Sequence, residues 1–207
     1  MLQRVSFPVG GAEIEGLLHV PDGETIGGVA VLGGRIQSID SLTYLCEAIA
    51  AAGVAALRFA HRADDGLDRL ADTAAAIRLL RGHPSIPQRI GVVGHSYGAA
   101  IAALAAGRDS RLRSAVLIAP PAQRDYFGSI KPIAELSRTR AKVLIVAPGA
   151  DEVIHPADAE RYAAVLRQGG APCRVVRIDG ADHMFTRPEH REALVSTVTA
   201  WLHETLA

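Results

Sequence analysis

The feature that most constrains this chain is a serine between two glycines, placed where an apolar run gives way to an alanine-rich run. Residues 90–93 read Ile-Gly-Val-Val, Gly94-His95-Ser96-Tyr97-Gly98 follows, and residues 99–106 are mostly alanine. This order predicts a buried strand, a tight turn and a helix, with the serine held clear of the sheet. The flanking glycines let the strand and the helix approach closely. The alternative is a glycine-rich turn whose serine merely caps the helix.

Length and composition narrow the class of protein. A chain of 207 residues can bury a sizeable core, and we expect residues 1–207 to form a single domain. Basic and acidic residues number 22 each, so the zero net charge gives no sign of nucleic acid or an anionic membrane as partner.

The N-terminal residues lack the apolar core of a signal peptide, and a cytoplasmic protein is therefore expected. Cys46 and Cys173 match no metal or redox spacing, and small buried side chains are favoured over a disulfide.

Short apolar runs alternate with helical patterns, which predicts βαβ units and a mainly parallel sheet. An antiparallel hairpin at residues 5–9 and 12–20 is expected to open the chain, with Gly10-Gly11 as its turn. Further strands are expected at residues 29–32, 54–59, 90–93, 115–119, 141–146 and 174–178. Helices are expected at residues 38–52, 67–80, 99–106 and 157–167 and at the C-terminus. The prediction is an α/β fold of about eight strands, with helices on both faces and ligands bound at the carboxyl ends of the strands.

A serine nucleophile needs a base, and the base needs a carboxylate that orients it. In the order that accompanies this turn motif, the acid and then the histidine follow the serine along the chain. Asp151 follows the strand at residues 141–146 after a Pro-Gly turn, and His183 follows the last strand after another glycine turn. We therefore assign Ser96 as the candidate nucleophile, Asp151 as the acid and His183 as the base.

Three neighbouring residues compete for these roles. Glu152 adjoins Asp151, but its longer side chain is expected to point elsewhere. His155 also follows the serine near a strand end, although it shares a loop with Asp151. Asp182 adjoins His183, where a carboxylate is badly placed to orient the ring, so a turn or capping role is expected instead.

A tetrahedral intermediate would need backbone N–H donors for its oxyanion. One donor is expected to be the N–H of Tyr97, at the positive end of the helix that Ser96 opens. The second is expected from the loop after residues 29–32, where either Gly34 or Arg35 would supply it. Neither a metal nor another cofactor is expected.

Together these residues resemble the α/β-hydrolases, and in particular their small dienelactone-hydrolase-like and esterase-like members. The resemblance covers nearly the whole chain and rests on residues 94–98, the Asp151 loop and residues 180–185. It implies an eight-stranded doubly wound sheet and hydrolysis of a carboxylic ester or thioester through an acyl-serine, without a cofactor. The chain departs from the family in two places. Gly33-Gly34 stands where many members have His-Gly, and Ser96 stands where many dienelactone hydrolases use cysteine.

The stretch that forms a cap in larger hydrolases is short in this chain. Only residues 120–140 are available there, and residues 121–128 are expected to form a short flap and one small helix over an open, shallow site. Substrate contacts are expected from Tyr126, Phe127 and Met184, with ordinary packing as the alternative. Three arginines near the strand ends could bind an anionic substrate, although paired or solvated charges are the favoured interpretation: Arg35, Arg58 and Arg62.

The favoured function is a serine hydrolase that cleaves a small carboxylic ester, so that the expected partner is a small ester or thioester. A thioesterase or an acyltransferase would use the same three residues with a different leaving group or acyl acceptor. A non-catalytic binding protein on a hydrolase scaffold is the alternative of another class, because fold does not dictate function. The presence of nucleophile, acid and base in order argues against it.

Overall fold

The computed structural model describes residues 1–62, 66–122 and 127–207. These residues form an eight-stranded sheet in the order β1-β2-β4-β3-β5-β6-β7-β8. The strands are β1 (Leu2–Val9), β2 (Ala12–His19), β3 (Gly27–Leu32), β4 (Val54–Phe59), β5 (Ile90–His95), β6 (Ser114–Ile118), β7 (Lys142–Pro148) and β8 (Cys173–Ile178). β2 pairs antiparallel with β1 and β4, and the strands from β4 across to β8 are parallel. The predicted α/β fold of about eight strands, mainly parallel with an antiparallel hairpin at its start, is confirmed.

The opening hairpin has the turn that its sequence predicts. Gly10 and Gly11 both have positive φ, at 57° and 84°, which is the backbone that a two-residue hairpin turn needs. The hairpin is longer than predicted, because Leu2 already pairs with His19.

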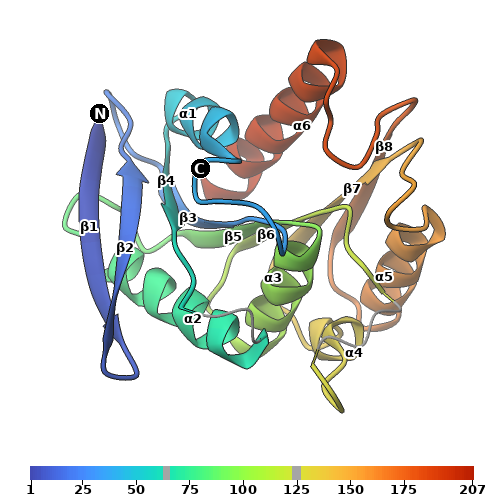
Figure 1. Ribbon diagram of the computed structural model, residues 1–207, viewed down its shortest axis with the longest axis horizontal. Coiled ribbons are helices and arrows are strands. Elements are labelled where there is room, and N and C mark those ends of the chain that lie inside the picture. The colour runs from blue at the N-terminus through green and yellow to red at the C-terminus, as the bar shows by residue number, and fades with distance from the viewer. Residues whose placement is uncertain (63–65, 123–126) are drawn as a thin grey trace.

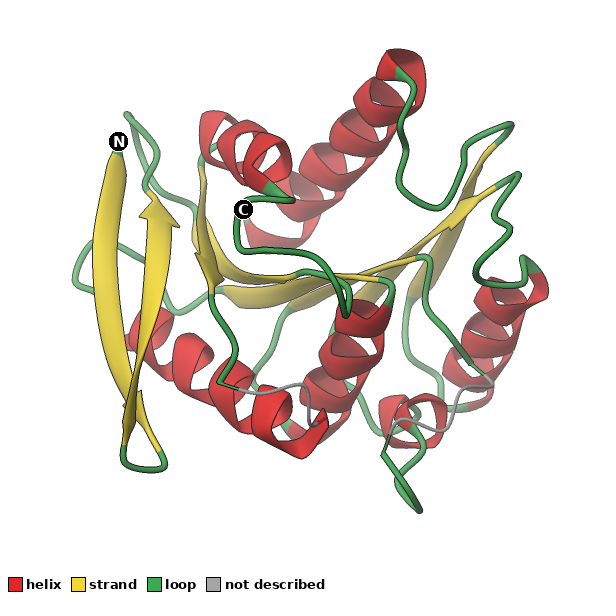
Figure 2. Ribbon diagram, in the orientation of Figure 1, coloured by secondary structure: helices red, strands yellow, loops and turns green. Residues whose placement is uncertain are grey.

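Helices cover both faces of the sheet, as Figures 1 and 2 show. On one face lie α1 (Thr43–Ala51) and α6 (Pro188–Leu206). The other face is covered by α2 (Gly66–Gly82), α3 (Tyr97–Arg108), α4 (Pro132–Leu136) and α5 (Ala157–Gln168). Alternate residues of one strand serve the two cores, since Val92 packs with the α2–α5 side and Val93 with the α1–α6 side.

The predicted helix at residues 38–52 is shorter in the structure and begins at Thr43. Residues 38–42 form turns, in which Ser41 N–H donates to the Ser38 carbonyl and Thr43 N–H to the Asp40 carbonyl. The apolar spacing continues through this stretch, but local hydrogen bonds by short polar side chains compete with helix there.

The alanine-rich helix α3 lies directly against the sheet. Every residue from Tyr97 to Ala106 is buried. A methyl group on Gly98 would overlap the backbone carbonyl of Leu32, and one on Gly94 would overlap the carbonyl of Gly98. These glycines are therefore needed for the close approach of α3 to β3 and β5, as the sequence indicates.

Two further findings concern features outside the site. Cys46 is buried, Cys173 is half-buried, and both are free thiols, with burial raising the pKa of Cys46 to about 12. Among the described residues, we find no helix that combines the length and the apolar character needed to cross a bilayer.

Candidate active site

Ser96 occupies a strained turn between β5, which ends at His95, and α3, which begins at Tyr97. Its φ of 56° and ψ of −120° lie outside the regions that L-residues favour, at a cost of about 1–3 kcal/mol. The Ser96 N–H donates to the Ile118 carbonyl at 2.8 Å, which ties the turn to β6. The Ser96 side chain makes no capping hydrogen bond to α3. The capping alternative is therefore wrong.

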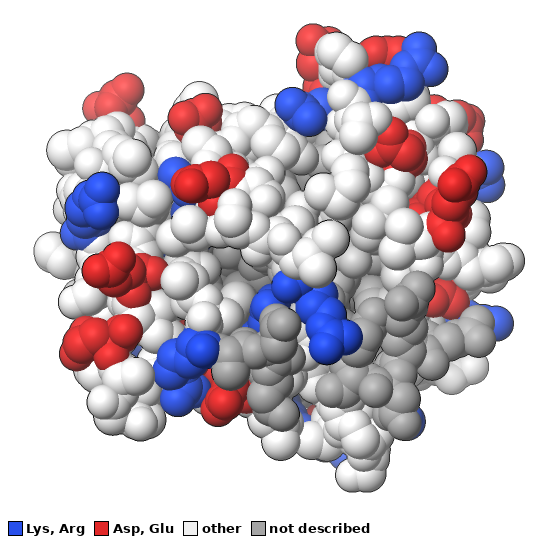
Figure 3. Space-filling view, in the orientation of Figure 1, with Lys and Arg blue, Asp and Glu red and all other residues white. Residues whose placement is uncertain are grey.

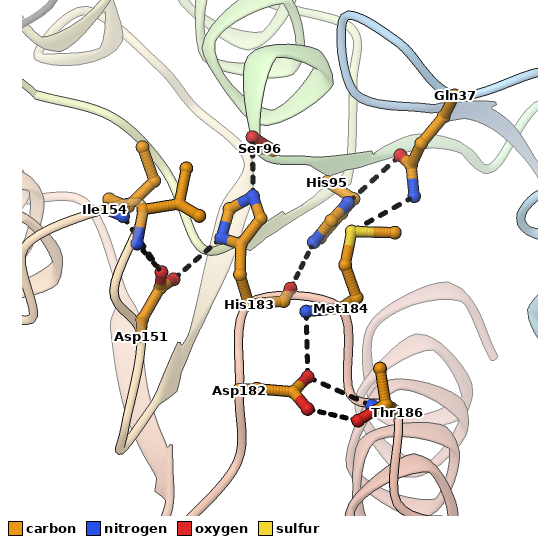
Figure 4. Close-up of polar contacts among 10 residues, drawn as sticks. Gln37, His95, Ser96, Asp151, Ile154, Asp182, His183, Met184 and Thr186 are labelled. Carbon is orange, nitrogen blue, oxygen red and sulfur yellow. Dashed lines mark hydrogen bonds and ion pairs between the residues drawn. The ribbon is translucent and has the colours of Figure 1, made fainter.

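The three residues assigned from the sequence are joined by hydrogen bonds (Figure 4). His183 Nε2 lies 2.9 Å from Ser96 Oγ, and His183 Nδ1 lies 2.8 Å from Asp151 Oδ2. Ser96 follows β5, Asp151 follows β7 and His183 follows β8, all at the carboxyl edge of the sheet. The ring of His183 therefore bridges the hydroxyl group and the carboxylate.

The carboxylate of Asp151 is held in place from its second oxygen. Asp151 Oδ1 accepts hydrogen bonds from the N–H groups of Val153 at 2.8 Å and Ile154 at 2.9 Å. Burial acts to raise the pKa of Asp151, but the hydrogen bonds from His183, Ile154 and Val153 outweigh it and lower the pKa below its usual value. The side chain is thus a carboxylate at neutral pH. The competing Glu152 is exposed to solvent.

The other two competitors serve their own loops. His155 is exposed, and its Nδ1 accepts the Ala157 N–H at 3.1 Å at the start of α5. Asp182 accepts the N–H groups of Met184 and Thr186 at 3.0 Å each, and also the Thr186 hydroxyl. The turn role predicted for Asp182 is confirmed.

The β3–α1 loop (residues 33–42) lies against Ser96. A Cβ placed on Gly34 would be 3.4 Å from the Ser96 Cβ. Gln37 N–H donates to the Gly34 carbonyl at 3.3 Å, which closes a turn over Arg35 and Ile36. Gly34 N–H donates to Gln37 Oε1. The Arg35 N–H, by contrast, makes no hydrogen bond within the described part of the chain.

The expected substrate contacts have different environments. The Phe127 ring stacks on the Tyr97 ring, with centroids 5.7 Å apart and planes at 4°, and both side chains are buried. The Arg69 guanidinium lies 5.1 Å from the centroid of the Tyr97 ring. Phe127 thus packs in the core, whereas Met184 is 45% exposed beside His183. Tyr126 lies outside the described residues.

Two of the three arginines considered for anion binding are engaged in ion pairs. Arg58 is buried, and its Nη1 donates to the Ile39 carbonyl at 2.9 Å and to Asp40 Oδ1 at 2.5 Å. Arg62 Nε donates to Asp72 Oδ1 at 2.6 Å. The paired interpretation therefore holds for both, with the difference that Arg58 is a buried charge and not a surface one.

Sequence reasoning missed two residues that contact the site. His95 is buried, its Nδ1 lies 3.0 Å from Gln37 Oε1, and its Nε2 lies 2.8 Å from the His183 carbonyl oxygen. The position of His95 next to Ser96 was a usable signal. Gln37 carries no motif, and only the folded loop reveals it.

A cavity of about 380 Å³ lies at the carboxyl ends of β3 and β4. Its lining includes Gly33, Gly34, Gln37, Arg58 and Arg69. Figure 3 shows basic side chains near the middle of the viewed face and most of the acidic ones toward its edges. Within the described residues, no group of three or more His, Cys, Asp or Glu side chains is arranged to hold a metal ion.

A mostly parallel sheet that presents a strained serine after its central strand, within reach of a histidine after the last strand, is the arrangement of the α/β-hydrolases. The chain has this fold. The model of the dienelactone hydrolase family matches residues 48–205. The chain therefore belongs to the dienelactone hydrolase family and is a member of a family of hydrolases.

Solved structures of low sequence identity share the fold. Est1E from Butyrivibrio proteoclasticus has a TM-score of 0.83 and 18% identity over 98% of both chains. The esterase domain of a Rhodothermus marinus protein has a TM-score of 0.81 and 20% identity over 100% of both chains. The Pyrobaculum calidifontis esterase has a TM-score of 0.81 and 21% identity, over 100% of this chain and 87% of its own. A search of curated protein sequences returned no significant match.

Proposed function

We propose that this protein is a serine hydrolase that cleaves small carboxylic esters through an acyl-serine intermediate on Ser96. The observation that carries the proposal is the chain of hydrogen bonds from Ser96 Oγ through the His183 ring to the buried Asp151 carboxylate. A serine hydroxyl is a weak nucleophile by itself, and an oriented imidazole is the group that activates it.

In the proposed acylation, Ser96 Oγ attacks the ester carbonyl carbon while His183 Nε2 takes the hydroxyl proton. Asp151 remains ionised, keeps the Nδ1–H tautomer of His183 and stabilises the imidazolium that forms. When the tetrahedral intermediate collapses, the carbon–oxygen bond to the leaving group breaks and His183 gives that oxygen its proton. Water then attacks the acyl-serine while His183 Nε2 takes a proton from it, and collapse of the second tetrahedral intermediate releases the acid and returns the proton to Ser96 Oγ.

The negative oxygen of the tetrahedral intermediate needs donors next to Ser96. Tyr97 N–H, at the first residue of α3, is one proposed donor, because the helix N-terminus adds a positive field. Arg35 N–H is the other, because the N–H of Gly34 already donates to Gln37. Removing one such donor costs about 3–4 kcal/mol of transition-state stabilisation in comparable enzymes.

The site favours small substrates. β6 ends at Ile118 and β7 begins at Lys142, and between them the described residues hold only the five-residue helix α4. The cavity beside Gly34, at about 380 Å³, is at the small end of the range of ligand pockets. Ser96 and His183 are not among the residues that line this cavity, so the short segment between β6 and β7 carries the proposal of small substrates.

The test is hydrolysis of p-nitrophenyl esters from acetate to octanoate by the wild-type protein and by Ser96→Ala. Ser110→Ala is the matched control, because Ser110 is exposed and follows the far end of α3. We expect turnover in the wild type and the control, loss in Ser96→Ala, and a preference for short chains. Equal turnover by Ser96→Ala would refute the proposal.

Acyl thioesters in the same assay test the thioesterase alternative, which predicts faster turnover of thioesters than of oxygen esters with the same acyl group. If no substrate turns over, labelling with a fluorophosphonate probe is the next measurement. Labelling of Ser96 would show an activated serine with a narrower substrate range, whereas no labelling would favour the non-catalytic alternative.

A further inference from the structure

Gln37 and His95 contact both loops that would have to meet at the substrate carbonyl. One is the β3–α1 loop, which carries the proposed donor Arg35 N–H. The other is the β8–α6 loop (residues 179–187), which carries His183. In Figure 4, His95 lies between the Gln37 side chain and the His183 carbonyl.

We propose that Gln37 and His95 are positioning residues, which together hold the β3–α1 loop and the β8–α6 loop in the mutual geometry that the reaction requires. The inference rests on the proposed function of Ser96. Neither residue is assigned a contact with the substrate, because Gln37 acts through Gly34 and His95 acts through Gln37 and His183.

Gln37 fixes the two peptide groups that flank the Gly34 Cα. Its Oε1 accepts the Gly34 N–H, and its own N–H donates to the Gly34 carbonyl at 3.3 Å. That carbonyl and the Arg35 N–H belong to one planar trans peptide, in which the two groups point in opposite directions. Binding the carbonyl therefore aims the Arg35 N–H away from Gln37. Gly33 and Gly34 have more backbone freedom than other residues, so the orientation of the Arg35 N–H depends on the hydrogen bonds to Gln37.

His95 anchors Gln37 to the rigid centre of the sheet. It is the last residue of β5, is 3% exposed, and lies next to Ser96 in the chain. Burial, with His183 nearby, lowers the pKa of His95 to about 4, so the ring is neutral at pH 7 and carries one proton. Both of its neighbours are acceptor oxygens, and the single proton serves one contact at a time. The ring nevertheless fills the space between the two loops and sets their separation.

A third contact joins the same loops. Gln37 Nε2 lies 4.0 Å from the sulfur of Met184, the residue after His183. The proposed donor, Arg35 N–H, and the proposed base, His183, are thus both positioned relative to Ser96 by contacts with His95. Catalysis is sensitive to such placement, because a shift of about 1 Å in a reacting group can cost about a hundred-fold in rate.

The test compares Gln37→Leu, His95→Leu and the double variant on p-nitrophenyl acetate. We expect kcat of Gln37→Leu to fall about ten-fold or more, with KM changed by less than about twofold, because the loss is in placement and not in substrate binding. The double variant is expected to lose no more than the worse single variant, since the two residues act as one unit. His95→Gln places an amide near the former Nε2 position and should recover much of the kcat that His95→Leu loses.

Gln88→Leu is the control, because Gln88 is an exposed glutamine that donates to the Arg81 carbonyl. Its kcat should equal that of the wild type. The rate of Ser96 labelling by a fluorophosphonate gives a second readout, because the phosphonyl oxygen uses the same donors. We expect the maximal labelling rate of Gln37→Leu to fall while its half-saturating probe concentration stays constant. If Gln37→Leu does not fold, Gln37→Asn replaces it, since the shorter amide cannot make both contacts.

The outcomes separate the two proposals. If wild-type turnover does not depend on Ser96, the proposed function fails. If turnover depends on Ser96 but Gln37→Leu keeps wild-type kcat and labelling rate, only the positioning role fails. Fully multiplicative losses in the double variant would also overturn it, because they would show two independent effects.

Discussion

The Nε2 atom of His183 lies 2.9 Å from the Oγ atom of Ser96, although 87 residues separate them in the chain. Their strands are not neighbours, since β6 and β7 lie between β5 and β8. The loops after β5 and β8 converge because the parallel strands all end at the same edge of a twisted sheet. The contact is therefore a product of the strand order, and it depends on loop lengths that no local pattern encodes.

Ser96 stores backbone strain that substitution can release. We expect Ser96→Gly to be more stable than Ser96→Ala by about 1 kcal/mol, because glycine tolerates φ 56° while alanine keeps the strain. Both variants lack the hydroxyl and should lack turnover. Urea denaturation of the two variants at pH 7 measures the difference. A less stable Ser96→Gly would show that the turn is not strained.

Asp151→Asn should reduce kcat by about ten-thousand-fold, because an amide supports the wrong tautomer of the neighbouring histidine. The same variant should also change how the free energy of unfolding depends on pH in acid. The folded-state pKa of Asp151 lies below the ordinary 3.8, so its stabilising contribution is present above pH 3.8 and is lost as pH falls through the lowered value. Urea unfolding from pH 7 to pH 3 should therefore give a shallower decline for Asp151→Asn than for the wild type. Parallel curves would contradict the lowered pKa.

His95 should make the protein less stable in mild acid. Its pKa falls from 6.5 to about 4 on folding, so between these values the unfolded chain binds a proton that the folded protein excludes. Stability is then full above pH 6.5 and decreases as pH falls toward 4, by about 3 kcal/mol in total. The free energy of unfolding of wild type and His95→Gln, measured at pH 7 and pH 4.5, checks this. The variant should lose less than the wild type between the two pH values.

Gly98→Ala tests the close approach of α3 to β3. The added methyl group would overlap the carbonyl oxygens of Leu32 and Gly33, which are backbone atoms at the root of the β3–α1 loop. We expect a loss of about 2 kcal/mol in stability together with a fall in kcat. Gly82→Ala is the matched control, because a Cβ at Gly82 meets nothing within 4 Å, and it should be neutral or slightly stabilising. Equal stability of the two variants would rule out the steric argument.

The sequence by itself determined the type and order of the main elements, and it singled out Ser96, Asp151 and His183, which the structure joins by hydrogen bonds. These features rest on local chemistry: apolar periodicity, glycine turns and the order of the residues around a strand–turn–helix motif. Such signals extend over a few residues only, so they can be recognised in the sequence without knowing which residues pack against them. The small helix expected at residues 121–128 is a different case, because α4 lies further along the chain at Pro132–Leu136 and residues 123–126 lie outside the described residues.

Only the tertiary structure decided the contacts that long-range packing creates. It buried Phe127 against Tyr97, and it engaged Gly34 N–H so that Arg35 N–H is the proposed donor. It also brought Gln37 to His95, which lies 58 residues further along the chain. Each of these contacts depends on side chains that meet only when the sheet has formed, because the strand order places them together and their spacing in the sequence does not.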